Sequence, residues 1–254
     1  MGKVIGIVSG KGGVGKTIFS VNLASTLAKK GFSVLLIDTN VTSPNISFFV
    51  GSPIKRYTLT DVLSGECNIN DSIYAYTKGN FSYMPSSLSI NKLYKVSISK
   101  LKSIVDALKT QYDYVVLDGP ANMDGEFLEV VRASDELAVI ATPDIISVTD
   151  ALRVLEFGRR HGRKIIGLII NKYEQKDYNL KVKDIELLAG DKLFGAIPRD
   201  ENIKMSLVKR APVCLLYPKT NSTFAFEQIA CKIAGLPVPI KKKNLWDKIC
   251  FWND

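Results

Sequence analysis

The fold of this chain is decided by Ser9-Gly10-Lys11-Gly12-Gly13-Val14-Gly15-Lys16-Thr17. This stretch fits the loop pattern G-x-x-x-x-G-K-[ST], with Gly10 and Gly15 as the two fixed glycines. An apolar run at Val4–Ser9 precedes the loop and a helical pattern at Thr17–Lys30 follows it, as the motif requires. The sequence therefore predicts a strand, a phosphate-binding loop and a helix in direct succession.

The residue types of this loop suit a triphosphate and its metal ion. Glycines let successive backbone N–H groups curl around phosphate oxygens, and the start of the helix adds partial positive charge. We expect Lys16 to reach the β- and γ-phosphates and the Thr17 hydroxyl to bind Mg²⁺. The loop residues expected to bind the nucleotide are Gly10, Lys11, Gly12, Gly13, Val14, Gly15, Lys16, Thr17 and Ile18.

Short apolar runs alternate with helical stretches along most of the remaining chain. This alternation predicts an α/β fold with a mainly parallel, twisted sheet and helices on both faces. The further strands are expected at Val34–Asp38, Tyr114–Asp118, Leu137–Thr142, Ile165–Asn171 and Leu193–Ile197. The further helices are expected at Asp150–His161 and Phe224–Ala234, and Gly31 is expected to end the first helix. The region Pro53–Ser99 carries no definite pattern.

Length and composition place the chain among ordinary globular proteins. Its 254 residues are 46% apolar and 23% charged, which excludes a disordered chain and a coiled-coil rod. We expect one large domain over residues 1–236, followed by a basic tail at 237–254. The net charge of +9, from 34 Lys and Arg against 25 Asp and Glu, favours polyanionic partners: nucleotides, nucleic acid or anionic lipid.

The scarce residue types exclude several classes of site. The cysteines lie far apart without a C-x-x-C pair, which argues against a metal–thiolate site and a disulfide framework. They are Cys67, Cys214, Cys231 and Cys250. The single histidine, His161, excludes a mechanism that needs two imidazoles. The sequence predicts neither a signal peptide nor a membrane-spanning run.

Lys11, directly after the first glycine of the loop, is not part of the general pattern. The run Lys11–Thr17 resembles the deviant Walker A motif of the MinD/ParA/Mrp/nitrogenase-iron-protein superfamily, which belongs to the SIMIBI class of P-loop NTPases. The resemblance implies an ATP-dependent homodimer in which Lys11 reaches the nucleotide of the second subunit. Ile18 replaces the second Thr that is usual in this family, which implies the loss of one hydroxyl contact to the α-phosphate.

Two predicted strand ends resemble the switch regions of this family. The resemblance implies that Asp38 and Asp118 hold Mg²⁺ through water. Asn40 stands where the family carries a second carboxylate that positions or activates the attacking water. Because an amide can orient a water but cannot accept its proton, we expect slow ATP hydrolysis. The expected catalytic residues are Lys11, Lys16 and Asn40.

Further positions resemble nucleotide contacts of the same family. Gly119 matches a glycine whose N–H senses the γ-phosphate, and Asn171 matches an asparagine that reads the adenine edge. Pro198 and Asp200 match a segment that wraps the base. The resemblance covers about residues 2–235 and is nearest to archaeal MinD-like proteins.

The tail favours the MinD branch of the family. The absence of paired cysteines excludes the iron–sulfur branches. In a helix over Lys241–Trp252, one arc is apolar, which is typical of a helix that lies in a membrane interface; this arc holds Leu245, Trp246, Ile249, Cys250 and Trp252. This reading implies a cytoplasmic ATPase, peripheral at the inner face of the cell membrane, that acts as a spatial or cell-division-type switch with an unidentified protein regulator.

Two alternatives stay open at this point. The tail could instead pack on its own domain. The protein could also be a weakly hydrolysing, nucleotide-gated module that docks on a protein partner or, in the manner of ParA, on DNA without sequence preference. The residues available for DNA phosphates are the basic cluster Arg153, Arg159, Arg160, Arg163 and Lys164.

Overall fold

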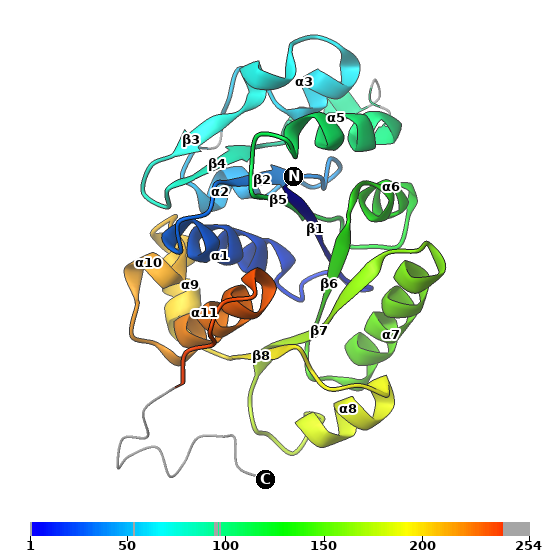
Figure 1. The fold of residues 1–254 in the computed structure, drawn as a ribbon, viewed down its shortest axis with the longest axis vertical. Helices are drawn as coiled ribbons and strands as arrows, with labels where there is room; N and C mark the ends of the chain where they lie inside the picture. The colour runs from blue at the N-terminus through cyan, green and yellow to red at the C-terminus, as the bar shows by residue number, and fades with distance from the viewer. Residues whose placement is uncertain (1, 53, 94–95, 97, 241–254) are drawn as a thin grey trace.

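A computed structural model describes residues 2–52, 54–93, 96 and 98–240 of the chain (Figure 1). The proposed membrane helix, Lys241–Trp252, lies outside these residues. Among the residues described, no helix is both long and apolar enough to cross a bilayer.

The described residues form a single eight-stranded sheet in the order β3-β4-β2-β5-β1-β6-β7-β8. Its strands are β1 (Lys3–Val8), β2 (Val34–Asp38), β3 (Tyr74–Tyr76), β4 (Phe81–Met84), β5 (Tyr114–Asp118), β6 (Glu136–Ala141), β7 (Lys164–Tyr173) and β8 (Gly195–Pro198). All neighbouring strands are parallel except the edge pair β3 and β4. The carboxyl ends of the central strands therefore meet along one edge of the sheet.

Helices cover both faces of the sheet (Figure 1). They are α1 (Lys16–Lys29), α2 (Ile46–Phe49), α3 (Leu59–Ser64), α4 (Ile90–Leu93), α5 (Leu101–Leu108), α6 (Gly125–Ala133), α7 (Ile145–Arg160), α8 (Val182–Ala189), α9 (Glu201–Val208), α10 (Val213–Leu216) and α11 (Asn221–Ala234). Two 3₁₀ turns are η1 (Ile69–Ser72) and η2 (Ile98–Lys100). The α1 and α11 helices pack together on one face, and α5, α6 and α7 lie on the other.

Each face of the sheet carries its own hydrophobic core. Along β5, Val115 and Leu117 pack into the core under α5–α7, while Tyr114 and Val116 pack into the core under α1 and α11. Full burial stabilises the fold by about 1.5–3 kcal/mol for each large aliphatic side chain. A strand buried on both faces must be apolar at every position, which explains the continuous apolar runs of the sequence.

The predicted fold class is confirmed, and the predicted strands agree with the observed bounds to within two residues at each end. The α7 helix begins at Ile145, five residues before the expected start, because Asp144 caps it and accepts from the N–H of Ser147 at 2.9 Å. The hairpin β3–β4 lies in the region without a definite pattern. Its strands are three and four residues long, too short to show a period.

Candidate nucleotide-binding site

The loop between β1 and α1 lies at the carboxyl edge of the sheet, where β1 stands between β5 and β6. Gly13 and Gly15 have φ angles of 77° and 96°, a conformation that a residue with a Cβ rarely adopts. A Cβ on Gly15 would also lie 2.3 Å from Nδ2 of Asn171. The sequence therefore needs glycine at these positions to shape the curled backbone of the loop.

Lys16 is folded inward at the start of α1. Its side chain is buried, and its Nζ donates to the Ser9 hydroxyl at 2.7 Å. Burial lowers the pKa of the Lys16 ammonium, and the nearby Asp118 carboxylate opposes that shift. The residue expected to contact the β- and γ-phosphates is thus a buried cation beside the loop.

Lys11 behaves differently from Lys16. Its side chain is 45% exposed, and its Nζ lies 3.7 Å from Oδ1 of Asp144, the cap residue of α7. An exposed pair of this kind contributes little to stability. Lys11 is therefore available at the surface of the protomer, as a contact across a dimer would require.

Asp38 and Asp118 end neighbouring strands and stand opposite each other in the register of β2 and β5. Both are fully buried, and burial raises the pKa of Asp38 to about 8 and the pKa of Asp118 to about 6. The charge of Asp118 adds to the shift of Asp38, whereas Thr17, Ser20 and Lys16 favour the ionised form of Asp118. Two adjacent buried carboxylates are stable in ionised form only beside a cation.

The acidic pair fits a magnesium ion. One oxygen of Asp38 accepts from the N–H groups of Asn45 and Ile46, at 2.9 and 3.0 Å, whereas its Oδ1 is buried without a partner among the described residues. A buried acceptor without a partner is costly and marks a place for a cation or its water shell. Thr17, whose hydroxyl donates to Asp118, completes the predicted set of metal ligands.

Asn40 organises the loop that follows β2. Its Oδ1 accepts from the N–H of Ser43 at 3.2 Å and lies 3.4 Å from the Thr42 hydroxyl. The same hydroxyl lies 3.4 Å from Oε2 of Glu126 at the start of α6. Asn40 is therefore a turn-forming residue in this conformation, and its predicted role toward water stays a prediction.

Gly119 does not offer its N–H to a ligand in this conformation. That N–H donates to the carbonyl of Ile7 at 3.0 Å. A Cβ at Gly119 would lie 2.7 Å from the same carbonyl oxygen, so the two backbones touch. Contact with a γ-phosphate would require this hydrogen bond to break.

The predicted adenine residues lie at the ends of β7 and β8. Asn171 is buried, its Nδ2 donates to the carbonyl of Val14 at 2.7 Å, and its Oδ1 has no partner among the described residues. That free acceptor suits the amino group of a purine. Pro198 ends β8, and Asp200 caps α9 by accepting from the N–H of Asn202 at 2.9 Å. Asp200 also accepts from the Ser222 hydroxyl, at 2.6 Å.

Sequence reasoning assigned no role to three residues that shape the site. Ser9 holds the Lys16 ammonium, and Ser20 donates to Oδ1 of Asp118 at 2.9 Å. Lys172 donates from Nζ to the carbonyl of Gly13 at 2.7 Å. Ser20 stands four residues after Lys16, on the same face of α1, and this spacing was the one signal available in the sequence.

The family described as the CobQ/CobB/MinD/ParA nucleotide binding domain matches residues 5–213. The chain belongs to this family. As a MinD/ParA-type P-loop ATPase, it is 33% identical over 246 residues to an uncharacterized ATP-binding protein of Methanocaldococcus jannaschii, covering 96% of this chain and 93% of that protein. It is 31% identical to the septum site-determining protein MinD of a Synechocystis strain, covering 94% of this chain and 92% of that protein.

A solved structure extends the MinD/ParA likeness to the whole described domain. The septum site-determining protein MinD of Pyrococcus horikoshii, complexed with Mg-ADP, superposes with a TM-score of 0.88 at 28% identity. The match covers 92% of this chain and 96% of that chain. The predicted family is confirmed, and nucleotide with magnesium is typical of it.

Most of the basic cluster lies at the amino end of β7, away from the nucleotide site, whereas Arg153 lies within α7 beside Asp150, which packs against Gly10 of the loop. Most of its charges are already engaged, because Arg153 pairs with Asp150, Arg160 with Glu156 and Lys164 with Glu136. Arg163 donates to two backbone carbonyls. The basic side chains of these ion pairs are exposed and the pairs contribute little to stability, so the charges stay accessible to other anions and the DNA alternative stays open.

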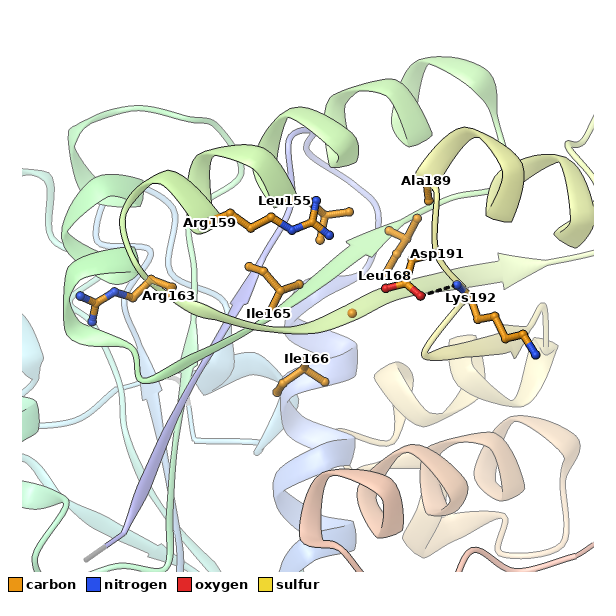
Figure 2. A pocket seen from close by; sticks show the side chains of 10 residues that line it. Leu155, Arg159, Arg163, Ile165, Ile166, Leu168, Ala189, Asp191 and Lys192 are labelled. Atoms are coloured by element: carbon orange, nitrogen blue, oxygen red, sulfur yellow. Dashed lines mark hydrogen bonds between the residues drawn. The ribbon is translucent and has the colours of Figure 1, made fainter.

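Beside this cluster lies a cavity of about 290 Å³ between α7, the start of β7 and the end of α8 (Figure 2). Leu155, Ile165 and Leu168 give it an apolar wall, and Arg159 and Lys192 are among the charged residues that line it. The cavity lies at the amino end of β7, whereas Asn171 lies near the carboxyl end of the same strand, beside the loop. It is therefore separate from the site for the nucleotide.

Proposed function

We propose that this chain is an ATP-dependent switch of the MinD type that binds Mg-ATP, dimerises and hydrolyses ATP slowly. The observation that carries this proposal is the set of buried polar groups at one edge of the sheet. Lys16, Asp38, Asp118 and Asn171 converge there from four different elements. Oδ1 of Asp38 and Oδ1 of Asn171 both lack a partner within the described residues, as a site built for a ligand requires.

The reaction is the attack of water on the γ-phosphate of ATP. Bound magnesium supplies charge neutralisation to the phosphates. The residues that would hold it are Thr17, Asp38 and Asp118. Lys16 and the N–H groups of the loop offset the charge that develops on the phosphoryl oxygens. Asn40 orients the water without accepting its proton, so turnover is slow.

Lys11 makes the protein a dimer in the presence of ATP. Its ammonium is exposed and pairs with Asp144 at 3.7 Å, a weak contact from which a phosphate of the second protomer can draw it away. Analytical ultracentrifugation tests this step with ADP and with ATP. We expect the wild type to be a dimer with ATP and a monomer with ADP. We expect Lys11→Ala to be a monomer with either nucleotide. A Lys11→Ala protein that dimerises like the wild type would contradict the role given to Lys11.

The chain divides into an ATPase domain at 1–236 and a membrane-targeting tail at 237–254. Two tails in one dimer bind a membrane more tightly than one tail, because the second binds with a high effective concentration. This coupling places the ATP-bound protein at the inner face of the cell membrane and the ADP-bound protein in the cytoplasm, where a protein regulator controls hydrolysis. The sequence of the tail supports this proposal through its lysines, its tryptophans and its apolar arc.

Liposome flotation tests the role of the tail. Anionic vesicles are mixed with the full chain or with a chain that ends at residue 240, with ATP or ADP. We expect the full chain with ATP to float and the other three combinations to stay in solution. Equal binding of the full and shortened chains would contradict the role of the tail and leave the ATPase site untouched.

A further inference from the structure

The carboxyl end of β7 departs from a regular strand at Asn171 and Lys172. Ile170 pairs with Ala196 and Tyr173 pairs with Pro198, so two residues of β7 stand opposite one residue of β8. Lys172 has a φ of 58°, in the left-handed region that residues with a Cβ seldom occupy. A bulge with a strained residue beside a functional site is a feature for which a role should be sought.

The bulge turns two successive side chains toward the same loop. In a regular strand, neighbouring side chains point to opposite faces of the sheet. Here Nδ2 of Asn171 donates to the carbonyl of Val14, and Nζ of Lys172 donates to the carbonyl of Gly13, both at 2.7 Å. Two consecutive residues of β7 thus hold two consecutive carbonyls of the phosphate-binding loop.

We propose that Lys172 is a positioning residue that holds the loop in its phosphate-binding shape through the Gly13 carbonyl. The C=O and N–H of a trans peptide unit point in opposite directions. Fixing the carbonyl of Gly13 therefore fixes the N–H of Val14, as fixing the carbonyl of Val14 fixes the N–H of Gly15. This inference rests on the proposed function, because it assumes that these N–H groups receive phosphate.

Lys172 acts on the loop rather than on the base. Its side chain is exposed, so solvent screens much of its charge, and its measurable effect comes from the hydrogen bond and the geometry that this bond fixes. Asn171 has a free acceptor for the base, whereas the ammonium of Lys172 donates to the loop carbonyl of Gly13. Loss of Lys172 should therefore weaken the binding of any triphosphate, whether or not it carries a base.

The experiment compares three variants of the full chain by calorimetry with Mg-ATP and with inorganic tripolyphosphate. Lys172→Asn removes the ammonium but tolerates the left-handed backbone, and Lys172→Arg keeps a donor. Lys183→Asn, on the exposed side of α8, removes the same charge away from the site. For Lys172→Asn we expect the Kd of both ligands to rise by about threefold to tenfold. Lys172→Arg and Lys183→Asn should stay within about twofold of the wild type.

Amide exchange of Val14 and Gly15 in the ligand-free protein gives a second measurement. In Lys172→Asn we expect faster exchange at Val14 and a smaller change at Gly15, whose peptide unit is held by Asn171. Exchange at both amides should be unchanged in Lys183→Asn. Unchanged affinity and exchange would overturn the proposal, and a loss confined to ATP would show a base contact instead. An equal loss in Lys183→Asn would show that net charge alone matters. If the wild type bound no ATP, the proposed function would fail, and the exchange rates would still decide whether Lys172 holds the loop.

Discussion

The two ends of β7 differ in how completely their polar groups are paired. At the amino end, Lys164 pairs with Glu136, and Arg163 donates to two backbone carbonyls, so most of the charge is satisfied within the chain. At the carboxyl end, Asn171 keeps a buried oxygen without a partner among the described residues, and Lys172 holds a strained backbone. Polar groups of β7 therefore have partners at its amino end, whereas a buried acceptor is left without one at its carboxyl end.

This difference distinguishes an ordinary charged surface, at the amino end, from a ligand-binding site, at the carboxyl end. Basic residues occur at both ends, and within the described part of the chain the carboxyl end alone combines burial, strain and a free acceptor. Unpaired buried groups cost free energy in the ligand-free protein, so their presence at one edge indicates that a ligand completes them there. The cavity near Arg159 has volume and charge but no such unpaired buried group among its described lining residues.

The largest effect should follow from removing Lys16, the buried cation at the carboxyl edge of the sheet. Lys16→Ala is expected to weaken ATP binding by about 100-fold or more, because the phosphates lose a desolvated charge partner. Fluorescence titration with a labelled ATP analogue measures this change. Lys29→Ala, at the exposed end of α1, serves as the control and should bind like the wild type. Equal affinities of the two variants would contradict the role of Lys16 as a contact to the phosphates.

The next effect concerns the loop after β2. Asn40→Asp restores a group that can accept a proton, so the ATP turnover rate is expected to rise by about 10²-fold. The fold should tolerate the change, because an aspartate also accepts from the N–H of Ser43. Phosphate release measures the rate, and Asn45→Asp provides the same charge elsewhere in the loop as a control. A rate that does not rise would show that Asn40 is only a turn-forming residue.

A smaller effect is expected in how the free energy of unfolding depends on pH, through Asp38. With a pKa near 8 in the fold and about 3.9 in the unfolded chain, Asp38 holds a proton between these pH values only when folded. The folded state then binds more protons, so stability falls as pH rises from 5 to 8. Asp38→Asn should reduce this fall by at least about 1 kcal/mol, or about 2–4 °C in Tm, without nucleotide or metal.

Thermal unfolding of wild type and Asp38→Asn at pH 5 and pH 8 measures that difference. Magnesium with nucleotide should stabilise the wild type more than the variant, because the variant lacks one of the two carboxylates. If both proteins lost the same stability over this pH range, the raised pKa that we assign to Asp38 would be contradicted.

The smallest effect is expected at the amino end of β7. The double variant Arg159→Ala, Lys192→Ala removes two of the cationic side chains that line the cavity. Its ATP affinity should stay within about twofold of the wild type, since surface substitutions of this kind change little. Calorimetry with Mg-ATP measures it. A larger change would connect the two ends of β7 and require a different account of the cavity.

The sequence motifs predicted the parts of the site that depend on local order. The loop Gly10–Thr17 and the two aspartates at strand ends follow from residue spacing and strand position, which a linear pattern records. Lys172 could not be predicted in its role, because its left-handed backbone depends on the register between β7 and β8. The pair of Lys11 with Asp144 likewise joins residues that are distant in the chain. Such contacts exist only after the sheet has assembled.

The loop between Gly10 and Thr17 is the proposed binding site for a triphosphate, and the other proposals depend on it. Calorimetric titration of the full wild-type chain with Mg-ATP tests it most directly. Our account predicts saturable binding that Lys16→Ala weakens by about 100-fold. Absence of binding at millimolar Mg-ATP would contradict it.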